Sequence, residues 1–153
     1  MDALELAIPP PVVMLAIAII MWLLFSLFPM FTLPSFSSLW VAIIIGLAGL
    51  VVGMFGVITF SRAGTTTNPG KTAQVSVLVT SGIYRLTRNP MYIGVLLILI
   101  GWGIYLGNVL ALMCAFIFVP YINRYQIQPE ERLLESKFGA AFISYKAKVR
   151  RWI

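Results

Sequence analysis

Two long stretches of the chain, residues 6–61 and 89–123, contain no aspartate, glutamate, lysine or arginine. Each stretch is much longer than the ~18 apolar residues that indicate a membrane-spanning helix. The pattern therefore predicts membrane helices, and the residues that interrupt them set their number.

Prolines and a Gly-Asn pair divide both stretches. Pro29 and Pro34 interrupt the first, because proline lacks an amide hydrogen and restricts the residue before it. Gly107-Asn108 interrupts the second. We therefore expect an all-α, polytopic membrane protein with four transmembrane helices, the third and fourth forming a short hairpin. The expected helices cover residues 11–28, 39–60, 91–106 and 109–124.

The chain becomes polar after Pro129. Residues 130–139 read as a short helix that Gly139 ends, since glutamates suit the first turn of a helix. A second amphipathic segment, 138–149, places Phe142 and Tyr145 on one face among lysines and arginines. This C-terminal segment is expected to lie on the cytoplasmic membrane surface, with Trp152 at the interface.

Charged residues are scarce and unevenly placed. The chain is 60% hydrophobic and 10% charged, which excludes an ordinary soluble domain. All 11 Lys and Arg fall either between the second and third expected spans or after the fourth. The positive-inside rule then predicts a multi-pass protein of the cytoplasmic (inner) membrane with both termini in the cytoplasm. Orientation and contact with anionic lipid explain the net charge of +6, and no nucleic-acid-binding motif is present.

The rare residue types exclude several chemistries. With no histidine and one cysteine, Cys114, the chain cannot form a His-ligated metal site, a Ser-His-Asp triad or an intrachain disulfide. No metal site is expected.

Four glycines of the second expected span, Gly46, Gly49, Gly53 and Gly56, fall on one helical face. Small residues at this spacing let helix backbones approach closely in lipid. Helix packing is the favoured interpretation, and a glycine-lined substrate groove is the alternative.

The expected topology brings two polar segments, 65–92 and 123–151, to one membrane face. Arg85 and Arg88 would then lie near Glu130 and Glu131, around a polar pocket that opens sideways to lipid. In the alternative, these arginines only mark the end of a membrane helix and the glutamates only cap another.

The amino-acid sequence of these two segments resembles that of a known family. The stretch LVTSGIYRLTRNPMYIG at residues 78–94, followed by Glu130-Glu131, Phe138-Gly139, Tyr145 and Arg151, is similar to the isoprenylcysteine carboxyl methyltransferase and phospholipid methyltransferase superfamily. The resemblance covers about residues 76–151. It implies a single integral-membrane domain, 1–153, in which 1–60 form two spans and 61–153 the cofactor-binding and catalytic half.

The resemblance also implies S-adenosylmethionine as cofactor, and it transfers a set of binding positions. These are Ser76, Val77, Leu78, Val79, Tyr84, Asn89, Pro90, Met91, Tyr92, Gly101, Gly103, Glu130 and Glu131. Gly101 and Gly103 are explained almost as well by helix packing.

Three residues are expected to serve catalysis, Arg88, Tyr92 and Glu130. Glu130 can accept hydrogen bonds from the cofactor's amino group or ribose hydroxyls, and Arg88 can hold its carboxylate. The faces of Tyr84 and Tyr92 can stabilise the sulfonium or stack on adenine.

The chain departs from the family pattern at two positions. Asn89 replaces the histidine that usually precedes the proline, and it cannot titrate. Gln126 stands where the prenylcysteine enzymes have a substrate-contacting arginine, and Arg124 lies two residues earlier. Arg124 and Gln126 are therefore the candidate substrate-binding residues, and a prenylcysteine substrate in particular is disfavoured.

The favoured hypothesis is a membrane methyltransferase that uses S-adenosylmethionine on a lipid-like or prenylated acceptor, at the cytoplasmic face. An NADPH-dependent lipid reductase is one alternative, because membrane steroid reductases look similar in their C-terminal halves. A non-catalytic four-helix partner subunit is another, supported by the glycine face. The sequence leaves the methyl acceptor and the oligomeric state open.

Overall fold

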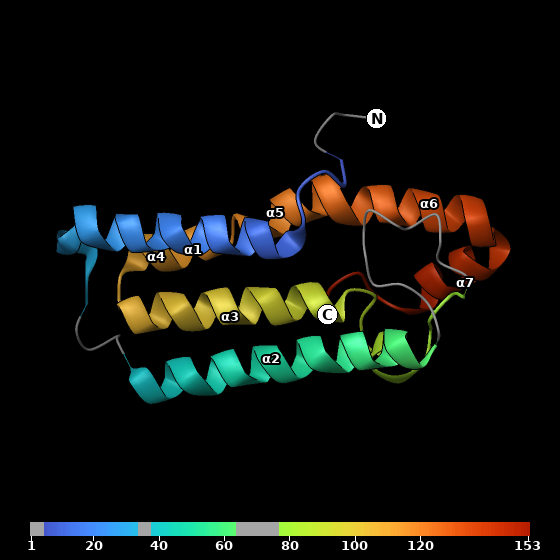
Figure 1. Cartoon of the computed structure of the whole chain (residues 1–153), viewed down its shortest axis with the longest axis horizontal. Helices are drawn as coiled ribbons and strands as arrows, with labels where there is room; N and C mark the ends of the chain where they lie inside the picture. Colours follow the sequence, from blue (N-terminus) through green and yellow to red (C-terminus); the bar gives the residue numbers. More distant parts are fainter. Residues whose placement is uncertain (1–4, 34–37, 64–76) are drawn as a thin grey trace.

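The computed structural model describes residues 5–33, 38–63 and 77–153, and Figure 1 shows them folded into helices. No β-strand occurs in these ranges, so the all-α prediction is confirmed. The principal helices are α1 (Pro10–Leu27), α2 (Leu39–Arg62), α3 (Pro90–Leu106), α4 (Val109–Ala115), α5 (Phe118–Ile122), α6 (Gln128–Phe138) and α7 (Ala140–Lys148). Short helical turns η1 (Pro29–Phe31) and η3 (Gly82–Arg85) and a π-helical segment, η4 (Asn123–Ile127), connect them.

Local chemistry explains where α1, α2 and α4 begin and where α3 ends. Pro10 stands in the first turn of α1, and the Ser38 hydroxyl accepts from the amide of Val41 to cap α2. Gly107 ends α3 with a φ of 63°, a left-handed conformation that glycine adopts without strain. Asn108 then caps α4 by accepting from the amide of Ala111.

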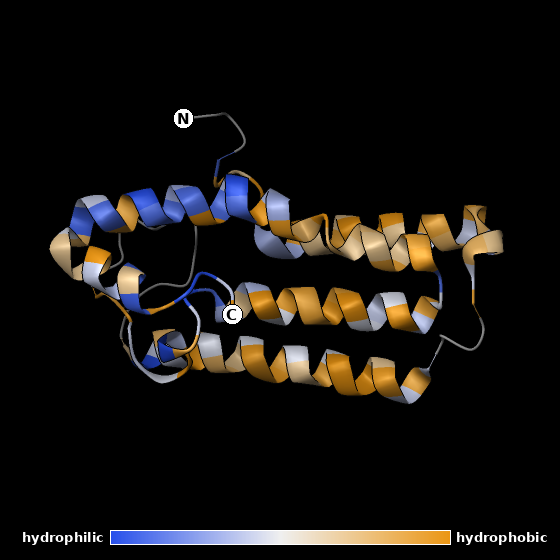
Figure 2. Cartoon of the chain, turned by 180° about the vertical axis from the view of Figure 1, so that it is seen from behind, coloured by the Kyte–Doolittle hydropathy of each residue, from blue (hydrophilic) through white to orange (hydrophobic). Residues whose placement is uncertain are grey.

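Three helical segments are long and apolar enough to cross a bilayer: α1, α2 and the segment Val109–Phe138. The 17-residue α3 is equally apolar and shorter. Large apolar side chains cover the outside of α1 and α2, and Ile44, for example, is 65% exposed. Figure 2 shows the apolar part of the molecule and the hydrophilic α6 at its other end. This distribution fits an integral membrane protein.

Helix α3 lies between α2 and the pair formed by α1 and α4 (Figure 1). A Cβ on Gly49 would lie 2.6 Å from the carbonyl oxygen of Gly94, and one on Gly101 would lie 2.8 Å from that of Ala42. The backbones of α2 and α3 are therefore in direct contact. The packing interpretation of the glycine face is confirmed.

Two connections meet at one end of the bundle. The Asn108 side chain donates to the carbonyl of Phe28 at 3.0 Å and to the hydroxyl of Thr32 at 3.1 Å, and the Leu33 amide donates to the carbonyl of Gly107. The turn after α1 and the turn between α3 and α4 therefore lie together. The polar segments η3, α6 and α7 gather at the opposite end.

The expected fourth span, 109–124, differs in the structure. Pro120 has no amide to donate to the carbonyl of Phe116, and a turn separates α4 from α5 there. Beyond α5 the chain does not break before Pro129: it widens into η4 and continues into α6. A π-helical turn accommodates the missing amide, so the segment stays helical to Phe138.

The chain before α1 docks onto this π-helical turn. Pro129 has no amide for the carbonyl of Tyr125, and that carbonyl accepts from the amide of Leu6 at 3.0 Å instead. The buried Gln126 amide donates to the carbonyl of Ile8 at 2.7 Å. Residues 5–9 are thereby held against the start of α6.

Helix α7 packs one face against the protein and exposes the rest, and Ile143, for example, is 52% exposed. Its Phe142 is only 2% exposed, so the face expected to contact lipid packs inside the protein. The Trp152 indole, expected at the membrane interface, donates to the Asn123 side chain at 3.1 Å. Gly139 allows this arrangement, because its φ of 50° turns the chain sharply after α6.

Candidate active site

A cavity of about 490 Å³ lies at the polar end of the bundle. Its size is within the range of small-molecule and cofactor sites. Its walls come from the segment before α1, the end of α2, the η3 region, the start of α3, α6 and α7. The lining residues are Pro9, Pro10, Pro11, Phe60, Val77, Leu78, Val79, Tyr84, Arg88, Asn89, Met91, Tyr92, Val95, Ile127, Glu130, Glu131, Leu134, Phe142 and Tyr145.

Glu130 and Tyr92 form a hydrogen-bonded pair in the cavity. The Tyr92 hydroxyl donates to Glu130 Oε1 at 2.8 Å, which links α3 to the first turn of α6. Desolvation raises the pKa of Glu130 to about 7, with the negative charge of Glu131 adding to it and the Tyr92 hydrogen bond opposing it. Glu130 therefore changes protonation state near neutral pH.

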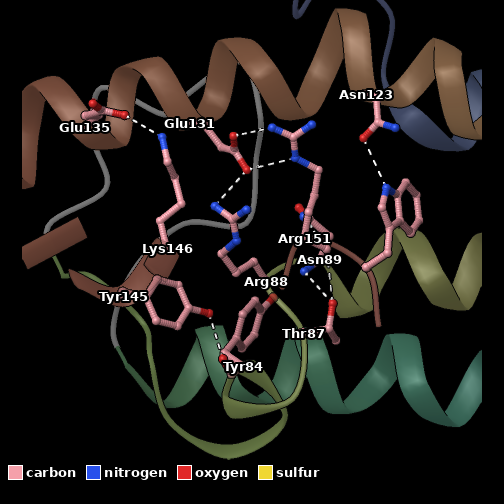
Figure 3. Close-up of polar contacts among 11 residues, drawn as sticks. Tyr84, Thr87, Arg88, Asn89, Asn123, Glu131, Glu135, Tyr145, Lys146 and Arg151 are labelled. Carbon is pink, nitrogen blue, oxygen red and sulfur yellow. Dashed lines mark hydrogen bonds and ion pairs between the residues drawn. The ribbon is translucent and has the colours of Figure 1, made fainter. Parts of the chain in front are cut away.

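Glu131 is held between two guanidinium groups, as Figure 3 shows. Arg151 donates through Nε to Oε1 at 3.1 Å and through Nη2 to Oε2 at 2.7 Å. Arg88 Nη1 lies 2.9 Å from Oε1. The side chains of Arg88 and Glu131 are 11% and 13% exposed and that of Arg151 is 32% exposed, so the Arg88–Glu131 pair is largely removed from solvent and Arg151 lies at its edge.

Arg88 has a buried hydrogen-bond donor that the described part of the chain leaves unsatisfied. Its Nε is buried and has no hydrogen-bond partner among the described residues. An unsatisfied donor in a buried position is costly unless a ligand or water satisfies it. Because Arg88 also lines the cavity, it suits an anionic group placed there.

The loop that contains Arg88 is fixed by the C-terminal residues. The Thr87 hydroxyl and the Asn89 amide both donate to the carbonyl of Arg151, at 3.2 and 2.9 Å. The Arg88 amide donates to the carbonyl of Arg150 at 3.0 Å. Asn89, where the superfamily resemblance implies a histidine, thus uses its side chain to hold the tail.

Aromatic residues form another wall of the cavity. The Tyr145 hydroxyl donates to the carbonyl of Tyr84 at 2.7 Å (Figure 3), and the Tyr84 ring meets Phe60 edge-on at 5.0 Å between centroids. Burial raises the pKa of Tyr84 and also raises the pKa of Tyr145 to about 12. Both phenols are therefore neutral at physiological pH.

The structure brings together most of the residues singled out in the sequence. Those that line the cavity are Val77, Leu78, Val79, Tyr84, Arg88, Asn89, Met91, Tyr92, Glu130 and Glu131. Ser76 lies outside the described residues.

Five other candidates lie elsewhere. Pro90 begins α3 and lies 3.3 Å from the Cβ position of Gly56, while Gly101 and Gly103 are packing positions between helices. Arg124 pairs with Glu5 at 2.9 Å, and Gln126 bonds to Ile8. Neither Arg124 nor Gln126 is part of the cavity lining.

Sequence reasoning missed the walls contributed by the two chain ends. Pro9, Pro10 and Pro11 line the cavity from the N-terminal side, and Phe142 from α7. The amphipathic pattern of 138–149 did identify Phe142 and Tyr145 as one face, but the pattern does not distinguish a lipid surface from a cavity. The proline triplet offered no signal beyond the start of a helix.

Comparison with known proteins identifies the family. The sequence profile described as phospholipid methyltransferase matches residues 28–141, about three quarters of the chain. The chain belongs to this family. The resemblance to the isoprenylcysteine carboxyl methyltransferase and phospholipid methyltransferase superfamily is thereby confirmed.

Curated relatives agree with this assignment. A protein named protein-S-isoprenylcysteine O-methyltransferase A from Arabidopsis thaliana is 28% identical over 138 residues, covering 88% of this chain and 70% of its own. A probable enzyme of the same name from Oryza sativa subsp. indica is 28% identical over 120 residues, and the alignment covers 76% of this chain and 63% of the rice protein. An uncharacterized Haemophilus influenzae protein is 52% identical over 63 residues, 41% of this chain and all of its own length. No solved structure matches the chain.

Proposed function

We propose that this member of the phospholipid methyltransferase family transfers a methyl group from S-adenosylmethionine to a lipid-like acceptor, in the cavity between α3, α6 and α7. The observation that supports this most directly is the pairing of an acceptor, Glu130, with an unsatisfied donor, Arg88, in one cavity beside apolar walls.

The residues present fit the cofactor. Glu130 suits the amino or ribose hydroxyl donors, and the guanidinium of Arg88 suits the carboxylate. The faces of Tyr84 and Tyr92 suit a sulfonium or an adenine ring. The superfamily resemblance implies Tyr84, Tyr92 and Glu130 as cofactor-binding positions, whereas the role of Arg88 is inferred from its charge and its place in the cavity.

The reaction class suits a cavity without histidine. S-adenosylmethionine supplies a methyl group on a sulfonium, a good leaving group, so no dedicated acid or base is needed for its departure. The chain's contribution is then to align the reactants and exclude water. The aromatic wall of Tyr84, Tyr145 and Phe142 covers the cavity and can do both.

A lipid-like acceptor follows from the apolar walls. Pro9, Pro11 and Phe60 belong to the cytoplasmic ends of the proposed spans, where the chain passes from bilayer to polar surface. An acceptor with an apolar tail can leave that tail in the bilayer while its reactive group enters the cavity. We include in this proposal a four-span topology with both termini in the cytoplasm, which the charge pattern supports.

Calorimetric titration of the detergent-solubilised protein with S-adenosylhomocysteine tests the site. We expect binding by the wild type and at least about tenfold weaker binding by Glu130→Gln, since a hydrogen bond to a charged group contributes about 1.5–3 kcal/mol. The matched control is Glu135→Gln. Glu135 lies on the same helix and pairs with Lys146 at 2.9 Å, outside the cavity lining. Equal affinities for all three proteins would contradict the proposed site.

The same preparation discriminates between cofactors. Only a ligand that binds the native state raises the unfolding temperature, so S-adenosylhomocysteine should stabilise the protein and NADPH should not. Stabilisation by NADPH alone would favour the reductase alternative.

A further inference from the structure

The cluster of Arg88, Glu131 and Arg151 contains two positive groups and one negative group in a poorly solvated place. Arg151 forms the two-point contact with Glu131, through both carboxylate oxygens. Arg88 approaches only Oε1, through Nη1, and its Nε has no partner. The two arginines thus share one carboxylate, Arg151 makes the two-point contact with it, and the cluster keeps one excess positive charge beside the cavity.

We infer that Arg151 is a positioning residue that keeps Arg88 available for the anionic group of the cofactor. This inference rests on the proposed function. Arg151 is not part of the cavity lining, so it acts through Glu131 and not by contact with a ligand. Without its guanidinium, Glu131 would turn its two oxygens to Arg88, because a two-point contact between carboxylate and guanidinium is the favoured geometry. Glu131 would then neutralise the positive charge of Arg88 at the cavity.

The backbone of the tail provides a separate function that substitutions of the Arg151 side chain leave in place. The carbonyls of Arg150 and Arg151 accept from the Arg88 amide and from the side chains of Thr87 and Asn89. Anchoring of the loop is therefore a property of the main chain. Binding of Glu131, which keeps Arg88 available, is a property of the Arg151 side chain. Loop anchoring and this side-chain role can therefore be tested separately.

The test measures the affinity of full-length protein in detergent for S-adenosylhomocysteine. Arg151→Ala should weaken binding about tenfold. Arg151→Lys keeps the positive charge but not the two-point contact with the carboxylate, so its loss of affinity should be smaller. Binding of 5′-methylthioadenosine, which lacks the amino-acid carboxylate, should change less than twofold in either variant. A loss that is equal for both ligands would overturn the inference, because it would indicate general damage to the site.

A second-site substitution makes the test more specific. In a Glu131→Gln background the neutral amide can still accept from Arg88 but cannot neutralise it, so adding Arg151→Ala should change the affinity by less than about threefold relative to Glu131→Gln alone. A purely structural role for Arg151 predicts the same loss of about tenfold in the wild-type and the Glu131→Gln backgrounds, and that result would overturn the inference. Failure of the wild type itself to bind S-adenosylhomocysteine would instead overturn the proposed function on which the inference rests.

Discussion

Glu130 links the protonation state of the cavity to ligand binding. Its pKa of about 7 lies above the ordinary glutamate value of 4.5, so the folded state favours the neutral carboxyl. Donors on a cofactor instead favour the carboxylate. We expect affinity for S-adenosylhomocysteine to rise about tenfold from pH 6 to pH 8, and to stay flat over that range in Glu130→Gln. A wild-type affinity independent of pH would contradict the assignment.

The raised pKa of Glu130 also makes the stability of the fold depend on pH. Stability falls as pH rises, whereas ligand affinity increases. Because the folded pKa is raised, the contribution of Glu130 to stability is complete below about pH 4.5 and is lost as pH rises through about 7. Glu130→Gln cannot ionise, so it should gain stability relative to wild type between pH 5 and pH 8. Thermal unfolding in detergent at several pH values measures this difference, and parallel curves for the two proteins would refute it.

Tyr92 adjusts the titration of Glu130. Its hydroxyl donates to the carboxyl and lowers the pKa of Glu130, against the larger effect of desolvation. In Tyr92→Phe we therefore expect the pH at which binding strengthens to move above 7, with a loss of stability of about 1–2 kcal/mol. The pH series for wild type provides the comparison. An unchanged midpoint would mean that the hydrogen bond does not control the carboxyl.

Residue-level prediction succeeded where a motif resides in one short segment. The segments 77–79 and 88–92 and the Glu130-Glu131 pair contain nine of the 19 residues that line the cavity, and the superfamily resemblance was enough to identify them. Arg124 and Gln126 were chosen by counting back from Glu130. Both lie within the π-helical segment η4, which changes the direction that each side chain takes, and they contact Glu5 and Ile8 instead.

At the scale of elements, the contact between α2 and α3 depends on specific glycines. A Cβ on Gly49 would lie 2.6 Å from the Gly94 carbonyl, whereas a Cβ on Gly46 meets nothing within 4 Å. We expect Gly49→Ala to destabilise the protein by about 1–3 kcal/mol through overpacking. Gly46→Ala is the matched control and should be neutral or stabilising, because alanine is the better helix former. Equal unfolding temperatures for the two variants would contradict the close contact.

Helix boundaries were predictable wherever proline, glycine or a capping side chain decided them. The third expected helix, 91–106, agrees with α3 to within one residue at its start, since Pro90 and Gly107 bound it. The predicted helix 130–139 agrees with α6, which has Pro129 in its first turn and ends at Gly139, but the continuity of α6 with η4 was not predicted. A proline usually stops a helix, but here the missing hydrogen bond is replaced by a long-range one, from Leu6 to the Tyr125 carbonyl. Such a partner, more than a hundred positions away, is not visible in a local pattern.

At the scale of the whole molecule, the structure groups the connections into two ends. The turns at Phe28–Thr32 and Gly107–Asn108 are bonded to each other, and the cavity lies at the opposite end. With the charge pattern, this predicts that Met30 and Lys148 face opposite sides of the membrane. In a Cys114→Ala background, a membrane-impermeant maleimide applied to intact spheroplasts should label Met30→Cys directly and Lys148→Cys only after permeabilisation. Labelling of both from the same side would refute the topology.

The function that we propose is methyl transfer from S-adenosylmethionine to a lipid-like acceptor in this cavity. The most direct measurement incubates the purified protein, reconstituted in vesicles of total lipid extract, with S-adenosylmethionine labelled in its methyl group, and follows label in the lipid fraction. We expect wild type and Glu135→Gln to label a lipid species at similar rates, and Glu130→Gln to label it at least tenfold more slowly at saturating lipid. Label transfer by Glu130→Gln at the wild-type rate, or none by wild-type protein that binds the cofactor, would contradict this proposal.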